Sequence, residues 1–225
     1  MMFDPLYLVM LIPVLLFSGW ASLLTQSRFA RYSKVRAYSG MTGARAAHRM
    51  LQAGGVHDVV IARSRGMLSD HYDPRTKTLR LSDEVHDGVS LAAIGVACHE
   101  AGHALQHAQG YAALGLRSML VPVAQFGSTL APWIFIVGML GNFGVLMDLA
   151  IVLLAAMFLF TLVTLPVEYN ASARAKEYVV AAGLVSPNQA ADTGKVLNAA
   201  FMTYLAAAAA ALFQLLYFIM RRGRR

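Results

Sequence analysis

The sequence predicts a mainly α-helical membrane protein, with about four transmembrane helices and a small α+β cytoplasmic domain. Of its 225 residues, 57% are hydrophobic and 14% are charged, whereas about 25% are charged in a typical soluble domain. About 20 apolar helical residues cross the ~30 Å of hydrocarbon in a bilayer. Four stretches are long and apolar enough: residues 3–24, 119–140, 143–166 and 199–220. A soluble protein is therefore excluded.

The first and middle stretches are predicted to be an anchor and a hairpin. No Lys or Arg precedes residues 3–24, and a cleaved signal peptide needs a basic start, so we expect this span to be retained. Only Gly141 and Asn142 separate the next two stretches, so residues 118–166 are predicted to form a transmembrane helical hairpin. Its far end carries Asp148 and no basic residue, which favours the side away from the cytoplasm.

Basic residues predict the orientation of the spans. Twelve Lys and Arg lie in residues 25–117, three in the loop 167–198 and four in the tail 221–225. Because cytoplasmic loops are enriched in Lys and Arg, both loops are expected in the cytoplasm. The span 199–220 would then carry the basic tail outside, against the same rule. Either the two loops outweigh the tail, or 199–220 is a re-entrant or interfacial helix.

The net charge of +7 and the single cysteine exclude further classes of protein. In a chain this apolar the positive charge indicates cytoplasmic loops rather than nucleic-acid binding, since no basic and aromatic recognition motif accompanies it. Cys98 alone can form neither an internal disulfide nor a thiolate zinc finger, and we expect it to be a buried core residue.

Residues 25–117 are predicted to form the cytoplasmic domain. A helix is expected over residues 41–53, capped by Thr42 and ended by Gly54 and Gly55. Short strands are expected over 59–62, 67–72 and 78–82, joined as a β-meander through a turn at 73–76. The edge of this sheet could accept an extended peptide, or its Arg and Lys side chains could simply protect it.

The chemistry is predicted on a helix over residues 90–106. It carries His99-Glu100-Ala101-Gly102-His103. Residues four apart lie on one face of a helix, so both imidazoles can bind one zinc ion, with Glu100 beside them to reach a metal-bound water. The alternative is a histidine pair with no metal, but a buried Glu with two His needs the partners that a metal would supply.

Catalytic zinc needs a third protein ligand. The position six residues after His103 is Gln109, and His107 lies two helical turns from His99, too far along a straight helix to share its ion. Glu168 follows the third span, and the hairpin returns it beside the motif, so we predict it as the third ligand. Two alternatives remain, namely Glu177 as the ligand, or Glu168 paired with Arg174 or Lys176.

Four segments together carry a resemblance to a known family. They are residues 68–75, residues 79–82, the motif-containing segment 97–108 and the segment 165–172, which reads Leu-Pro-Val-Glu-Tyr-Asn-Ala-Ser. The chain resembles the YugP-type neutral zinc metallopeptidases of bacterial membranes, which are membrane-embedded gluzincins distantly similar to HtpX-type and CAAX prenyl proteases. The resemblance covers nearly the whole chain.

The resemblance implies a zinc-dependent membrane endopeptidase with one Zn²⁺. Its ligands would be His99, His103 and Glu168, and Glu100 would be catalytic. Where the wider gluzincin pattern has an Asp four residues after the ligand Glu, this chain has Ser172. Asn170 or Asp70 is therefore expected to orient a ligand histidine. For the oxyanion the candidates are His71, Tyr72 and Tyr169, and His71 can alternatively be a turn residue bonded to a neighbouring Asp.

The predicted function is hydrolysis of peptide bonds in membrane or unfolded proteins. The protein is expected to be a multi-pass protein of the bacterial inner membrane, with its active site facing the cytoplasm. The partners are a protein or peptide substrate and the lipid bilayer, with no nucleic acid, and the sequence indicates no oligomeric state. A catalytically silent membrane scaffold that binds peptides is the alternative. A metal transporter is disfavoured, because the spans are nearly empty of ionisable residues.

Overall fold

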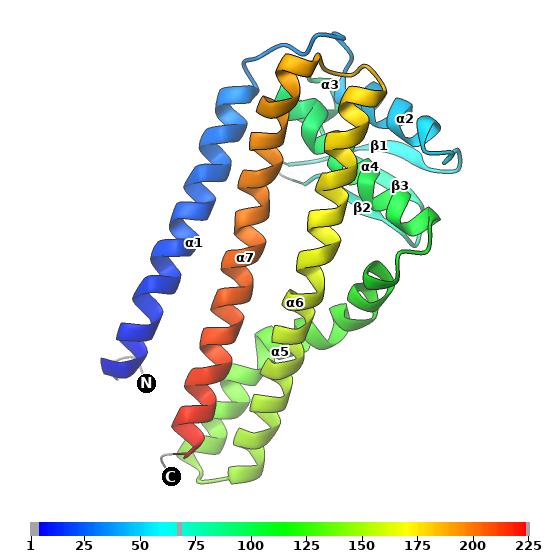
Figure 1. Ribbon diagram of the computed structural model, residues 1–225. Coiled ribbons are helices and arrows are strands. Elements are labelled where there is room, and N and C mark those ends of the chain that lie inside the picture. Colours follow the sequence, from blue (N-terminus) through cyan, green and yellow to red (C-terminus); the bar gives the residue numbers. More distant parts are fainter. Residues whose placement is uncertain (1–4, 67–68, 224–225) are drawn as a thin grey trace.

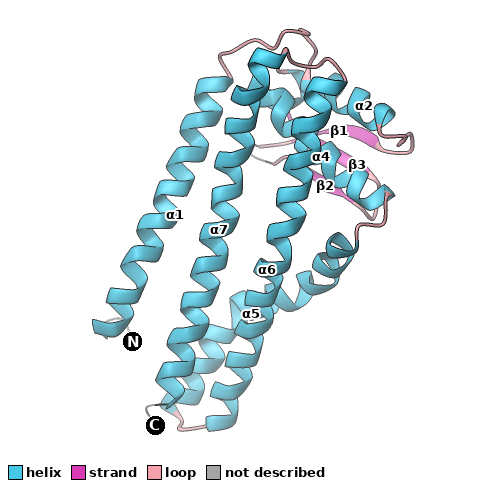
Figure 2. Cartoon of the chain, in the orientation of Figure 1, coloured by secondary structure: helices cyan, strands magenta, loops and turns pink. Residues whose placement is uncertain are grey.

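Four long helices form a bundle, and all the smaller elements gather at one end of it (Figures 1 and 2). The computed structural model describes residues 5–66 and 69–223. The long helices are α1 (Pro5–Tyr32), α5 (Ala112–Leu140), α6 (Gly144–Ala181) and α7 (Pro187–Gly223). The small elements are α2 (Gly43–Ala53), β1 (Val60–Ser64), β2 (His71–Asp73), β3 (Thr78–Ser82), α3 (Asp83–Asp87) and α4 (Leu91–Ala108). Both chain ends lie at the opposite end of the bundle (Figure 1).

The mainly helical membrane fold predicted from the sequence is confirmed. All four long helices are long and apolar enough to cross a bilayer, with mean hydropathies of 1.6–2.6 in their most apolar windows. Large apolar side chains are exposed along them, among them Leu16, Met119, Trp133 and Val145, as expected for contact with lipid. The helices are longer than the predicted apolar stretches. An apolar stretch shows only which residues can lie in the hydrocarbon of the bilayer, whereas a helix continues until its capping residues. Residues 3–4 of the expected first span lie outside the described residues.

The last helix is continuous and is one of the four helices able to cross a membrane, which favours a full span over the re-entrant or interfacial alternative. It spans 37 residues without a break and packs beside α1 and α6. Near its end Arg222 pairs with Asp148 of α6, with 2.9 Å between Nε and Oδ1. The described part of the basic tail therefore lies at the hairpin end, beside the acidic residue there, and residues 224–225 lie outside the description. The segment 167–198, expected as a loop, is helical except for residues 182–186.

The small domain has the expected helix but a different strand order. Thr42 caps α2 by accepting a hydrogen bond from the Arg45 amide, and Gly54 is the C-cap. The sheet order is β1-β3-β2, with β1 parallel and β2 antiparallel to β3, so the expected β-meander is wrong. The turn after β2 pairs it with β3, and β1 occupies the free edge of β3. Of the expected strand 67–72 only His71 and Tyr72 are in β2, and residues 67–68 lie outside the description.

Helix α4 is the centre of the small domain. Its Leu91, Ile94 and Leu105 are fully buried, and it packs against α2, α6 and α7. Ser90 caps its start by accepting a hydrogen bond from the Ala93 amide. Cys98 is also fully buried, as predicted, and burial raises the pKa of its thiol to about 12. The thiol therefore stays protonated and unreactive at neutral pH.

Small residues let α4 and α6 approach each other closely. Ala171 and Ala175 on α6 are fully buried. A Cβ atom added to Gly102 of α4 would lie 2.7 Å from the backbone carbonyl oxygen of Ala171. Glycine is therefore required at this crossing, because a backbone atom cannot move aside as the end of a flexible side chain can.

We predict that Gly102→Ala destabilises the protein by about 1–3 kcal/mol, the usual cost of inserting a methyl group into a tightly packed contact. Thermal unfolding of the detergent-purified protein measures it. Gly115→Ala on α5 is the matched control, since its added Cβ meets nothing within 4 Å. Equal unfolding temperatures for the two variants would contradict the tight contact.

Candidate metal centre

Two histidines of α4 and one carboxylate of α6 meet where these helices cross. Nε2 of His99 lies 3.1 Å and Nε2 of His103 3.5 Å from the same oxygen, Oε2 of Glu168. One ligand atom from each residue lies within 4.8 Å of the other two. The three side chains are only 13%, 9% and 1% exposed. The structure thus brings together the three residues that the sequence singled out as zinc ligands.

The far nitrogen of each imidazole is held by a polar side chain. Nδ1 of His99 lies 3.1 Å from the Ser172 hydroxyl, and Nδ1 of His103 lies 3.0 Å from Oε1 of Gln106. The Gln106 amide nitrogen donates to the carbonyl oxygen of Val167 at 2.8 Å, so the amide oxygen faces His103 and can only accept. His103 must then carry its proton on Nδ1, which leaves the lone pair of Nε2 directed at the cluster.

Asn170 acts one hydrogen bond further from the cluster than the sequence suggested. Its Oδ1 accepts hydrogen bonds from the Gln106 amide at 3.0 Å and from Nε of Arg174 at 2.8 Å. Arg174 also donates to Gln109, the C-cap of α4, at 2.6 Å. Asn170 therefore touches Gln106 rather than a histidine, and Arg174 pairs with amides and not with Glu168. Lys176 donates to Asn198 instead.

Two residues that sequence reasoning missed also reach Glu168. Arg117 of α5 places Nη2 3.4 Å from Oε1, the oxygen of Glu168 that faces away from the histidines. Tyr204 of α7 forms a side-chain hydrogen bond with Glu168. The only sequence signal for Arg117 is that it is the last charged residue before a long uncharged stretch, and Tyr204 has no comparable signal.

The chemistry of these side chains fits a zinc ion. Two imidazole nitrogens and one carboxylate oxygen, with room for a further ligand, are typical of catalytic zinc sites. Burial alone would lower the pKa of His103, but the hydrogen bond to Glu168 and the charges of Glu100 and Glu168 outweigh it and raise the pKa. The cluster therefore favours a positive charge at the place where a cation would bind.

A cavity of about 450 Å³ opens beside the cluster. Glu100, partly exposed, lines it together with His99 and Glu168. Glu168 lies 24 residues along α6 from Gly144, or about 36 Å at 1.5 Å per residue. Phe29, which also lines the cavity, likewise lies 24 residues along α1 from Pro5. The cavity is therefore about one hydrocarbon thickness from the other end of the bundle.

Of the remaining candidates from the sequence, Asp70 alone is among the residues that line this cavity. The Asp70 carboxylate accepts hydrogen bonds from the Ser82 amide and hydroxyl. His71 is exposed on the edge strand β2, with Nδ1 2.8 Å from the carbonyl oxygen of Ser69. Tyr72 and His107 hydrogen-bond to each other at 2.9 Å. Tyr169 and Glu177 are both exposed, and Glu177 is not part of the cluster.

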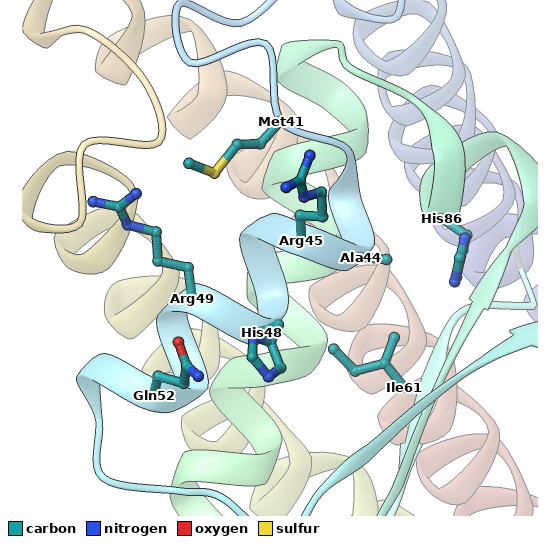
Figure 3. Close-up of a pocket in the computed structure, with 8 residues that line it drawn as sticks. All are labelled: Met41, Ala44, Arg45, His48, Arg49, Gln52, Ile61 and His86. Atoms are coloured by element: carbon teal, nitrogen blue, oxygen red, sulfur yellow. The ribbon is translucent and has the colours of Figure 1, made fainter.

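A larger cavity, about 530 Å³, lies away from the cluster on the outer face of α2. Arg45, His48 and Arg49 of α2 line it together with Ile61 of β1 and His86 of α3 (Figure 3). No carboxylate is among its lining residues. It therefore has no counterpart of Glu100 as an acid–base group, and no combination of imidazole and carboxylate such as His99 and Glu168.

Comparison with known proteins agrees with the geometry. Residues 7–223 match the family model described as "Putative neutral zinc metallopeptidase". The chain is 47% identical over 215 residues, 96% of each chain, to a Bacillus subtilis (strain 168) protein named "Putative membrane protease YugP". No solved structure matches. With four helices able to span a membrane and a family match over almost its whole length, the chain belongs to the neutral zinc metallopeptidase family.

Proposed function

We propose that this protein is a membrane-embedded zinc endopeptidase that hydrolyses peptide bonds in membrane or unfolded proteins. The observation that carries the proposal is the position of Glu100, which lines the same cavity as His99 and Glu168 without being part of the ligand cluster. An enzyme of this kind needs a carboxylate next to its metal with access to substrate and water. One zinc ion would be held by His99, His103 and Glu168.

The side chains of the site have separate roles in the proposed reaction. Zinc, when bound, supplies Lewis acidity that polarises the peptide carbonyl and makes water more acidic. Glu100 takes a proton from the attacking water and delivers it to the leaving amine nitrogen. Tyr204, which lines the cavity and contacts Glu168, would donate its one hydroxyl proton to the carbonyl oxygen instead of to Glu168 as negative charge develops on that oxygen.

Further residues would position the ligands and the substrate. Asn170 supports His103 through Gln106, as the hydrogen bonds described above indicate. Strand β2 lies at the edge of the sheet, where an extended peptide can add as a further strand. His71 on that strand is exposed and would be free to contact such a peptide.

We further propose that the site faces the cytoplasm from the inner membrane of a bacterium. The loop domain and the 182–186 connection lie at one end of the bundle, and the chain ends lie at the other (Figure 1). Residues 25–117 and 167–198 contain fifteen of the nineteen Lys and Arg, which favours the cytoplasmic side for that end.

Glu100→Gln should abolish cleavage of an unfolded protein substrate, by at least about 100-fold, the range expected for loss of a general base. Bound zinc, measured in the same detergent-purified samples, should equal that of the wild type, because Glu100 is not a ligand. Equal cleavage by both proteins would contradict the assigned role. Zinc binding without cleavage by either, over a range of substrates, would favour the silent scaffold.

Glu168→Gln should weaken zinc binding by more than about 100-fold, since the loss of groups that merely orient a ligand already costs about 10–100-fold. Competition with a chelator measures the affinity. Glu177→Gln on the same helix is the matched control, because Glu177 is exposed and outside the cluster. If the control loses zinc and Glu168→Gln does not, the third ligand is wrongly assigned.

Thr76→Cys in the turn between β2 and β3 should react with a membrane-impermeant thiol reagent in inverted vesicles but not in intact cells. Val145→Cys, at the hairpin end and 81% exposed in the wild type, should show the reverse pattern. Native Cys98 adds no background, because it is fully buried. Labelling of Thr76→Cys in intact cells would reverse the proposed orientation.

A further inference from the structure

The cavity beside Glu168 has two chemically different walls. Apolar side chains come from α1, α4 and α7, namely Phe29, Ala30, Val96, Val196, Leu197, Ala200 and Phe201. Carboxylates come from the small domain: Asp70 precedes β2, and Glu84 belongs to α3. Glu100 and His99 on α4 also line the cavity. A bound chain would therefore meet an apolar and an acidic surface close to the same catalytic group.

The acidic wall has no compensating cation. None of the described residues that line the cavity is Lys or Arg. Glu84 is exposed, and its carboxylate makes no hydrogen bond or ion pair with another described side chain. Asp70 hydrogen-bonds only to the uncharged Ser82. By contrast, Asp83 and Asp87, which flank Glu84 on α3, are both paired with Arg63. Glu84 and Asp70, which have no cationic partner among the described residues, thus line the cavity, whereas the paired Asp83 and Asp87 do not.

We infer that Glu84 and Asp70 form a subsite for a Lys or Arg side chain of the substrate, next to an apolar subsite on α1 and α7. This inference rests on the proposed peptidase function and names its substrate class: segments in which large apolar residues adjoin basic ones near the cleaved bond. Such junctions occur at the cytoplasmic ends of transmembrane helices. The height of the cavity, about one hydrocarbon thickness from the far end of the bundle, suits a chain emerging from the bilayer.

Electrostatics sets the expected size of the preference. Opposite charges near a protein surface attract each other, but an exposed pair retains only a part of this attraction after desolvation and side-chain ordering. We therefore expect a selectivity of about tenfold between a basic and an acidic residue at this position. Salt should weaken it, since screening over about 10 Å is already strong at 0.1 M.

The test uses three internally quenched peptides with one shared Leu- and Phe-rich segment, followed by two Lys, two Gln or two Glu. With the zinc-loaded wild type, kcat/KM should fall in the order Lys, Gln, Glu. Glu84→Gln should reduce the Lys-to-Glu ratio of kcat/KM values several-fold. Asp83→Asn, the neighbouring position on α3, should leave the ratio unchanged, because Asp83 is paired with Arg63 and does not line the cavity.

Binding without turnover separates this inference from the proposed function. Peptide affinities of Glu100→Gln, measured by fluorescence anisotropy, should show the same preference for Lys. Equal affinities and equal kcat/KM values for the Lys and Glu peptides would overturn the subsite while cleavage itself stands. A Lys preference in binding that Glu84→Gln removes, with no cleavage by the wild type, would support the subsite and contradict the peptidase. A preference that survives Glu84→Lys would also overturn the assignment.

Discussion

The site depends on the contact between Gly102 of α4 and the backbone of Ala171 on α6. The HExxH motif alone supplies two imidazoles and a carboxylate on one helix, and a third protein ligand must come from elsewhere. At this crossing the helix backbones are so close that no side chain separates them, and Glu168 reaches both imidazoles from about one turn away. A wider crossing would take Glu168 away from both imidazoles and leave its buried carboxylate with only Arg117 and Tyr204 as partners, and the loss of partners of a buried charge is costly.

Hydrogen bonds around the cluster remove the remaining freedom of the ligands. Arg174 can only donate, so Asn170 turns its oxygen towards Arg174 and Gln106, and Gln106 turns its own oxygen towards His103. The proton of His103 is thereby held on the nitrogen that faces away from Glu168. Each side chain in this series of hydrogen bonds is oriented by a neighbouring group that can act only as a donor or only as an acceptor. The order in the site thus originates at the surface of α6, in a charged side chain that contacts no ligand.

Local patterns predicted what depends on local geometry. The spacing of His99 and His103 places both on one face of any straight helix, and the short connection 141–143 returns α6 towards α4, which was enough to find Glu168. Arg117 and Tyr204 were missed because their positions depend on how α5 and α7 rotate about their axes, and faces that contact lipid or protein are both apolar. The strand order was missed for a similar reason: the residues of β1 do not show whether it pairs with β2, as in a meander, or with β3, as it does.

The length of α6 between the hairpin and Glu168 fixes the distance of the cluster from the hairpin end of the bundle. A fixed number of helical residues separates the hairpin from the cluster, so the depth of the reaction centre follows from where the hairpin sits in its leaflet. Natural bilayers differ in hydrocarbon thickness by several ångströms, from about 27 to 33 Å. In a thicker bilayer lipid tails would reach the cavity mouth, whereas in a thinner one the mouth would stand clear in the headgroup region. Lipid composition would thereby set how much of the cavity mouth lies among lipid tails.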